Sequence, residues 1–359
     1  MVMQMRQLAD KPDSTGYNLT HTVLDYMHRL VETQHKTGYP INQNFNLGTW
    51  NVIRSSLLLM SALPSEVDFL LPFVLSYIQA AHERLKSEGW PAGGTLCTEC
   101  DERHPKCSKI PGGGVCRFRY PDWMHILQQL LDAHEEHMTP SEIALVFEHM
   151  QLIGVWGFDF RSFYESPCPA DNSTTPCFPM DACNSAREHT DTGCLLPTWH
   201  KTFPMDTAAV HGVHGGAMAL KEGTVRWRMT GAQEDIELDE QKVALLERFQ
   251  GQPTGQFSAD ECFAGREARR GVELCTIVET MYSLGSMGQR DANVRYIDRL
   301  ERIALNALPA ALTADMWSHN YLSMINEVQA VKSEPRVWGD GENATTYGLA
   351  DRFTGVTPW

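Results

Sequence analysis

The chain has 359 residues, 42% of them hydrophobic, which is enough to bury a sizeable core in one large domain or two ordinary ones. Its formal net charge of -15 argues against a nucleic-acid partner, because the basic residues are too few to neutralise phosphates. The longest apolar run, residues 67–78, contains Asp68 and Pro72 and is too short to cross a bilayer. We therefore expect a soluble protein with neither nucleic acid nor membrane as a partner.

Helical periodicity dominates the first half of the chain. Residues 64–67 predict the start of a helix that Pro72 should kink or end. Asp122 is a candidate N-cap for a second helix, because apolar residues recur at helical spacing over 123–131. Thr139 and Glu142 form a capping box with proline at the first helical position, which predicts a third helix.

The second half is also helical, and strand-like alternation is scarce throughout. We predict helices over residues 210–228, from Cys275 onward and over 294–308. Short connections between amphipathic helices favour antiparallel pairs, and a ring of such pairs makes an (α/α) barrel. The predicted class is therefore all-α, and an (α/α) barrel is a physically reasonable arrangement of its helices. We expect the tail, 332–359, to start a connection to a further region.

Eight of the ten cysteines fall in two segments, 89–116 and 166–198, which also read as loops rich in turn-forming residues. Even numbers of cysteines in loops favour disulfides, and a zinc-binding interaction protein that uses the first loop is a weaker alternative. Sequons at Asn18, Asn172 and Asn343 also favour the secretory pathway. The first sixteen residues lack a signal-peptide core. The chain is therefore expected to be an internal piece of a longer secreted protein, or else a cytosolic protein with reduced thiols.

The candidate metal ligands are Glu273 and Cys275, which follow Gly271. Residues two apart project to one side of an extended segment but to nearly opposite sides of a helix. The two side chains can therefore share one ion only where an extended segment meets a helix, and Gly271 is placed to provide the break. Carboxylate and thiolate both suit zinc, although a buried cysteine is more often a small core residue.

The candidate general acid is Glu261, which follows Asp260 directly. A neighbouring carboxylate disfavours ionisation and so favours the protonated form that an acid catalyst needs. The alternative is a solvated loop pair or a helix N-cap.

Three blocks in this order resemble the β-L-arabinofuranosidase-like glycoside hydrolases. They are residues 211–231, which begin at His211, residues 271–283, which contain Glu273 and Cys275, and residues 296–317. The resemblance covers roughly residues 120–329, and the first hundred residues match poorly.

The resemblance implies an (α/α) barrel of the six-hairpin type, incomplete over residues 1–359 and followed in the family by β-sandwich domains, with zinc in the site. It implies that Glu273 and Cys275 are zinc ligands, that Glu261 protonates the leaving oxygen and that His211 hydrogen-bonds the sugar. The other two ligands, one of them the cysteine nucleophile, belong to a Cys-Cys pair that is expected beyond Trp359.

The implied activity is retaining hydrolysis of a non-reducing-end sugar in an oligo- or polysaccharide, with β-L-arabinofuranoside as the family's default substrate. Because no cysteine follows Cys275, we expect these 359 residues alone to be inactive. The alternative function is a catalytically silent carbohydrate-binding or structural protein on the same barrel.

Overall fold

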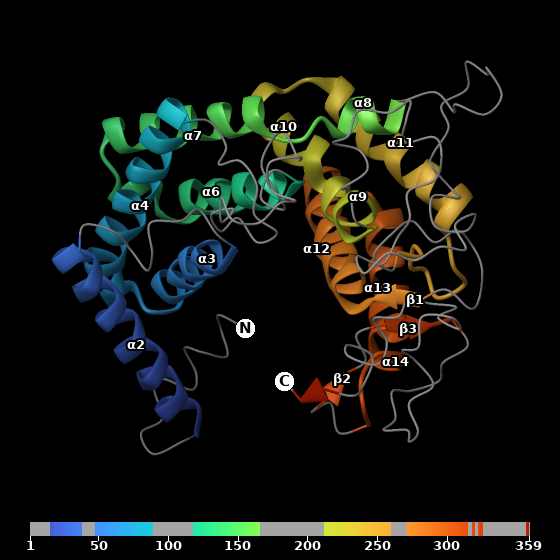
Figure 1. Ribbon diagram of the computed structural model, residues 1–359, viewed down its shortest axis with the longest axis horizontal. Coiled ribbons are helices and arrows are strands. Elements are labelled where there is room, and N and C mark those ends of the chain that lie inside the picture. Colours follow the sequence, from blue (N-terminus) through green and yellow to red (C-terminus); the bar gives the residue numbers. More distant parts are fainter. Residues whose placement is uncertain are drawn as a thin grey trace, which may run out of the picture. The chain divides into compact units, whose positions relative to one another are not determined.

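The computed structural model describes residues 15–37, 47–88, 118–165, 212–259, 271–314, 318–319, 322–325 and 357–358 (Figure 1). Helices make up almost all of these residues, and each described strand is two or three residues long, so the predicted all-α class is confirmed. Both cysteine-rich loops, and with them the predicted disulfides, lie outside the described residues. The chain divides into two compact units, residues 1–158 and 159–359.

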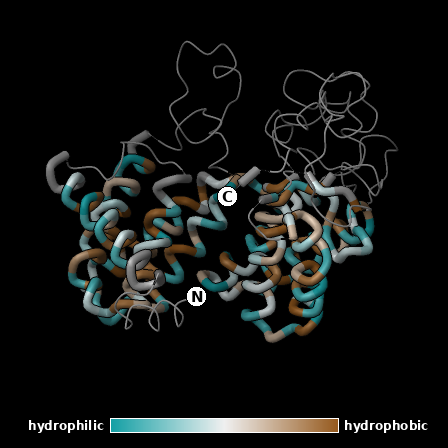
Figure 2. Tube along the Cα trace, turned by 90° about the horizontal axis from the view of Figure 1, so that it is seen from below, coloured by the Kyte–Doolittle hydropathy of each residue, from teal (hydrophilic) through white to brown (hydrophobic). Residues whose placement is uncertain are grey.

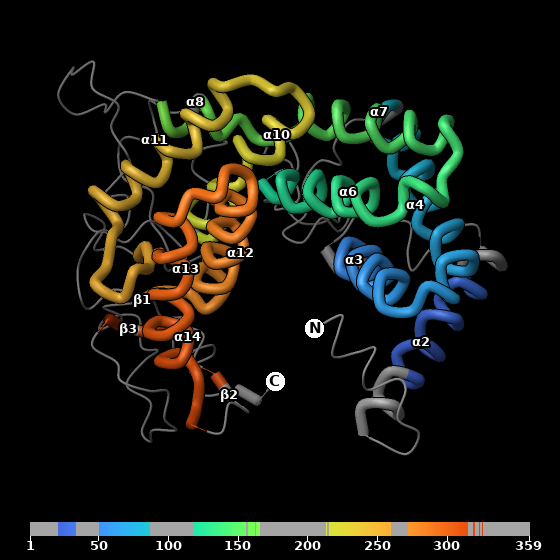
Figure 3. The backbone as a smooth tube through the Cα atoms, turned by 180° about the vertical axis from the view of Figure 1, so that it is seen from behind, coloured from blue at the N-terminus to red at the C-terminus, as the bar shows by residue number. Residues whose placement is uncertain are grey.

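The first unit contains two helix pairs. Its elements are α2 (Thr15–Thr37), α3 (Leu47–Ala62), η1 (Pro64–Glu66), α4 (Val67–Glu88), α6 (Tyr120–His134), η3 (Glu135–His137) and α7 (Pro140–Trp156). Short connections join α3 to α4 and α6 to α7, and the two helices of each pair pack on one another (Figure 3).

The first helices of these two pairs, α3 and α6, run in the same direction. Trp50 stacks on Trp123 with ring centroids 5.4 Å apart, and further along both helices Ser61 Oγ lies 3.3 Å from His134 Nε2. The parallel packing of successive antiparallel pairs is the repeating arrangement of an (α/α) barrel, so this unit has the local architecture that the sequence predicts.

Local sequence signals account for some of the helix ends. Thr139 and Glu142 form the predicted capping box at the start of α7. Of the two outcomes predicted at Pro72, the end of the helix is excluded, because α4 continues through it, and a kink stays a prediction. The burial of apolar residues on both sides of Pro72, such as Leu70 and Val74, outweighs one lost backbone hydrogen bond. One prediction is wrong. Asp122 lies inside the first turn of α6 and is not its N-cap.

The second unit is longer and includes the short strands. Its elements are α8 (Phe160–Glu165), α9 (Gly212–Gly216), η6 (Met218–Lys221), α10 (Glu222–Thr230), α11 (Gln233–Gln250), β1 (Gly271–Glu273), α12 (Leu274–Asp291), α13 (Val294–Leu305), α14 (Ala307–Ala310), β2 (Ser318–His319), β3 (Leu322–Met324) and β4 (Thr357–Pro358). Strand β1 pairs antiparallel with β3, and β4, near the end of the predicted tail, pairs with β2.

Two helix pairs again form the body of this unit. Gly231, in the left-handed conformation with φ of 69°, ends α10 and lets α11 turn back along it. Asn293 caps α13 with its side chain after the turn from α12. The predicted helices over 210–228 and 294–308 are each broken, the first into α9, η6 and α10 and the second into α13 and α14.

The first helices of these pairs also run parallel. Ser283 Oγ of α12 donates to the carbonyl of Ala217, and two turns further along Arg290 Nη1 lies 3.1 Å from Thr224 Oγ1. The segment α9–η6–α10 and α12 thus correspond to α3 and α6 of the first unit. Hydrophobic residues gather where the helices of each unit pack on one another (Figure 2).

Candidate functional site

The backbone changes from strand to helix at Glu273, as the sequence predicts. Glu273 is the last residue of β1 and the N-cap of α12, with an extended backbone (φ -64°, ψ 136°). Glu273 is 4% exposed, whereas Cys275, in the first turn of α12, is exposed and forms no disulfide with a described residue. The predicted backbone geometry is therefore confirmed, and the role of the two residues as zinc ligands stays a prediction.

Hydrogen bonds from two directions hold Glu273 in place. The strand pairing sets Glu273 opposite Leu322 of β3. On the other side, the Glu273 backbone N–H donates to the carbonyl of Ala259 at 2.9 Å, and Thr276 Oγ1 donates to the same carbonyl at 3.3 Å. The start of α12 is thus bonded both to β3 and to the segment that leads toward Glu261.

Glu261 and His211 themselves lie outside the described residues, but their described neighbours lie near α12. Ala259, two residues before Glu261, is bonded to Glu273 as described above. Gly212, directly after His211, starts α9, which packs on α12. Because α9 precedes Ala217 on a segment parallel to α12, it lies toward the N-terminal half of that helix. The roles of Glu261 and His211 stay predictions.

The donor chemistry of the described residues fits part of a zinc site. Glu273 offers carboxylate oxygen and Cys275 offers sulfur, both of which zinc accepts, but a structural zinc site needs four ligands and a catalytic one needs three from the protein. Within the described ranges, no group of three or more His, Cys, Asp or Glu side chains could hold a metal ion. The two residues are therefore at most half of a site.

A lysine and a glutamate beside Cys275 were missed by the sequence analysis. Lys221, which is fully buried, places Nζ 3.5 Å from Glu279 Oε2, 3.3 Å from Ser283 Oγ and 5.3 Å from the ring centre of Tyr282. Cys275, Glu279 and Tyr282 recur at i, i+4 and i+7 and so share one face of α12. That spacing was visible in the sequence, but Lys221 comes from a distant segment and gave no local signal.

The Glu279 carboxylate is 24% exposed, so it is held by a buried cation while part of it faces outward. A carboxylate accepts hydrogen bonds from hydroxyl groups, and a thiol and an aromatic ring lie on the same helix face. This face of α12 therefore presents a carboxylate, a thiol and an aromatic ring together.

Beneath the same helices lies a cluster of buried charges. Lys242 Nζ is 2.7 Å from Glu222 Oε2 and 3.5 Å from Asp239 Oδ1, while Arg290 Nη1 is 3.2 Å from Asp239 Oδ2. Burial raises the pKa of Asp239 to about 6, although Lys242, Thr224, Arg290 and the Gly223 N–H all act to lower it. The cluster joins α10, α11 and α12 through directional contacts.

Gly223 is required at this junction. Its N–H donates to Asp239 Oδ1 at 2.8 Å, and a Cβ at this position would come within 2.0 Å of the Asp235 carbonyl oxygen. A side chain would therefore push α10 away from α11.

No family model matches this chain, and no curated protein sequence does. Among solved structures, the chain is distantly similar to a glycoside hydrolase family 127 β-arabinofuranosidase, at 12% identity and a TM-score of 0.41. The match covers 82% of this chain and 52% of that enzyme, so the chain spans about half of the enzyme's length. Among the described residues, no helix combines the length and apolarity needed to cross a membrane.

Proposed function

We propose that this chain is the helical part of a glycoside hydrolase that removes a terminal sugar from an oligo- or polysaccharide. The observation that carries the proposal is the change from strand to helix at Glu273, which separates a buried carboxylate from an exposed thiol by one residue. The motif resemblance implies this local geometry. The parallel packing of successive antiparallel helix pairs also supports it.

In this proposal Glu273 and Cys275 hold zinc, with the remaining ligands supplied from outside the described residues. When bound, zinc would keep a coordinated thiol deprotonated at neutral pH. Hydrogen bonds to Ala259 and the pairing with β3 fix the Glu273 backbone, so this ligand is held before any metal arrives.

Glu261 is proposed as the general acid, which protonates the leaving oxygen of the glycosidic bond, and His211 as a hydrogen-bonding partner of the sugar. The proposed mechanism retains the anomeric configuration, and the attacking cysteine belongs to a later part of the protein. The default substrate of the resembled family, a β-L-arabinofuranoside, is the first to test.

The zinc content of the full natural protein that contains this chain tests the metal proposal. We expect bound zinc by mass spectrometry, and its loss in Glu273→Gln and in Cys275→Ser. Glu240→Gln, an exposed glutamate on α11, is the matched control and should keep the metal. Equal zinc in all four proteins, or none in any, would contradict the assignment of these two ligands.

Hydrolysis tests the reaction itself, in the full natural protein that contains this chain. Release of p-nitrophenol from p-nitrophenyl β-L-arabinofuranoside supports a glycosidase. Loss of this activity in Glu261→Gln, with zinc retained, supports Glu261 as the general acid. Loss of zinc in that variant would make Glu261 a ligand instead. A protein that is retarded on polysaccharide gels yet hydrolyses no glycoside of a broad panel would be the silent binder.

A further inference from the structure

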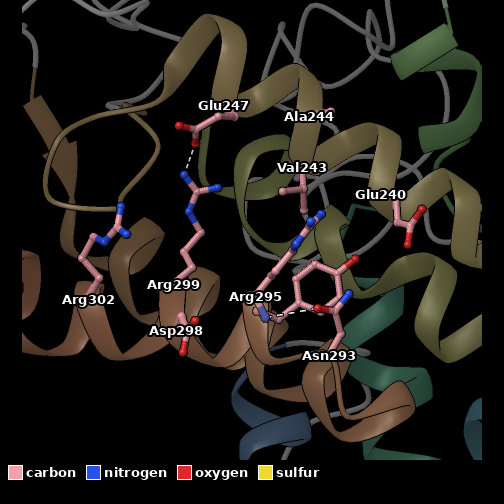
Figure 4. A pocket seen from close by; sticks show the side chains of 10 residues that line it. Glu240, Val243, Ala244, Glu247, Asn293, Arg295, Asp298, Arg299 and Arg302 are labelled. Atoms are coloured by element: carbon pink, nitrogen blue, oxygen red, sulfur yellow. Dashed lines mark hydrogen bonds and ion pairs between the residues drawn. The ribbon is translucent and has the colours of Figure 1, made fainter.

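An open groove runs along the surface of the second unit between α11 and α13. Its volume is about 520 Å³, within the range of small-molecule and oligosaccharide sites. Figure 4 shows its lining, which is contributed by Glu240, Val243, Ala244, Glu247, Asn293, Arg295, Tyr296, Asp298, Arg299 and Arg302. All of these residues come from α11, α13 and the turn before α13.

The two walls of the groove carry opposite charges. On the α13 wall, Arg295, Arg299 and Arg302 recur at i, i+4 and i+7, which places three guanidinium groups on one face of the helix. On the α11 wall, Glu240 and Glu247 lie seven residues apart. Asp298 also belongs to the lining, but Figure 4 shows its carboxylate directed away from α11.

A turn next to the groove contacts two of the three arginines. Gly255, with φ of 89°, allows this turn, and a Cβ there would meet the Arg302 stem at 2.9 Å. Arg299 Nε donates to the Gly255 carbonyl at 3.0 Å, and its guanidinium lies 4.4 Å from the ring centre of Phe257. Arg299 is therefore held in place before any ligand binds, and the Arg302 stem lies against the same turn.

The positive charges of this wall are only partly compensated. Arg299 forms an ion pair with Glu247. Within the described part of the chain, the Arg295 and Arg302 guanidinium groups form no ion pair within 4.0 Å and no side-chain hydrogen bond. Burial and the nearby charge of Arg302 together lower the pKa of Arg299 to about 10. Two exposed arginine side chains thus remain on this wall, and their backbone positions lie about 10 Å apart along the helix at about 1.5 Å rise per residue.

We propose that this groove binds an acidic saccharide, a sugar chain that carries carboxylate groups. Its carboxylates would bind the guanidinium groups of Arg295 and Arg302, whose planar donors match a carboxylate. Its hydroxyl groups would donate to Glu240 on the opposite wall. A polyphosphate matches the arginine wall alone, because it has no hydroxyl groups that could donate to Glu240. The choice of a saccharide rests on the proposed function, and the groove is separate from the residues proposed for catalysis.

Native electrophoresis of the 359-residue chain in gels that contain polygalacturonate tests the proposal. We expect retardation by polygalacturonate and none by its fully methyl-esterified, uncharged form. The double variant Arg295→Gln/Arg302→Gln should bind about tenfold more weakly, because two exposed charged contacts are lost. Arg248→Gln, an exposed arginine of α11 outside the groove lining, is the matched control and should bind as the parent does.

Three results would overturn the inference. They are no retardation by polygalacturonate, equal retardation by its methyl ester, and unchanged binding by the double variant. Gels that contain polyglutamate or polyphosphate identify the ligand class, and retardation by either as strong as by polygalacturonate would exclude the saccharide assignment. A chain that binds polygalacturonate but whose natural protein lacks zinc and hydrolyses no glycoside would retain this groove and lose the proposed function.

Discussion

The two units share a backbone plan but differ in what fills the space between their helix pairs. In the first unit, α3 and α6 meet through stacked Trp50 and Trp123, and the Trp123 indole N–H donates to the neutral, buried His149 at 3.0 Å. In the second unit, Lys242, Arg290 and Asp239 occupy the corresponding interior. Apolar burial stabilises a fold without fixing one arrangement, whereas charged contacts require their partners in place. The second unit, which contains the candidate site, is the one whose interior is held together by charged contacts.

The largest expected difference between the units comes from one lysine. Lys242→Met leaves Glu222 and Asp239 buried beside one cation fewer, and we expect a loss of about 3–5 kcal/mol in the free energy of unfolding. In the first unit, Leu127→Met should lower the free energy of unfolding by less than about 1.5 kcal/mol, because the side-chain volume is kept. Urea unfolding of both variants measures the two costs. Equal costs would mean that the charged cluster adds no special requirement.

Acid should increase the difference in stability between the two units. Burial, with His82 nearby, lowers the pKa of His149 from 6.5 to about 3. The folded state therefore resists protonation, and the stability that neutral His149 contributes is present above pH 6.5 and is lost as pH falls toward 3, by about 1.4 kcal/mol per pH unit.

Asp239 has the opposite dependence. Its raised pKa means that its contribution is present below pH 3.8 and is lost as pH rises through about 6. Hydrogen exchange at pH 4.5 and 7, corrected for intrinsic rates, should show α6 and α7 losing protection in acid relative to α10 and α12. In His149→Gln and Asp239→Asn this difference should shrink. If both units of the parent protein changed their exchange protection alike between the two pH values, the pH dependences assigned to His149 and Asp239 would be contradicted.

The smallest expected effect lies at the start of α7. Thr139→Ala removes the side-chain acceptor for the Glu142 N–H and should cost about 1 kcal/mol of stability, whereas Thr139→Ser should cost much less. Chemical denaturation measures both. Because this cap uses only neighbouring residues, its effect should be confined to the first unit.

Local signals in the sequence predicted local structure well. The capping box at Thr139 and the strand-to-helix change at Glu273 each depend on a few consecutive residues, and both were predicted. Pro72 does not end its helix, because burial from other helices outweighs a local preference. The helix predicted over 210–228 breaks where several glycines, which disfavour helix, lie together near Gly215.

The site was predicted only in part, for the same physical reason. Lys221 and Glu279 are 58 residues apart, and only the parallel packing of η6 on α12 brings them together. The groove between α11 and α13 likewise depends on a helix pairing, so its two charged walls could not be assigned to one another from spacing alone. Residues that act through a tertiary contact carry no signal in a single sequence.

The position of Glu273 at the first residue before α12 has an electrostatic consequence. The aligned peptide dipoles of this 18-residue helix place roughly half a positive elementary charge at its N-terminal end. A carboxylate there is typically stabilised by about 0.3–1 kcal/mol, without any side-chain partner. The backbone itself therefore favours negative charge where the metal is proposed to bind. A change that delayed the start of α12 by one turn would remove this field from Glu273.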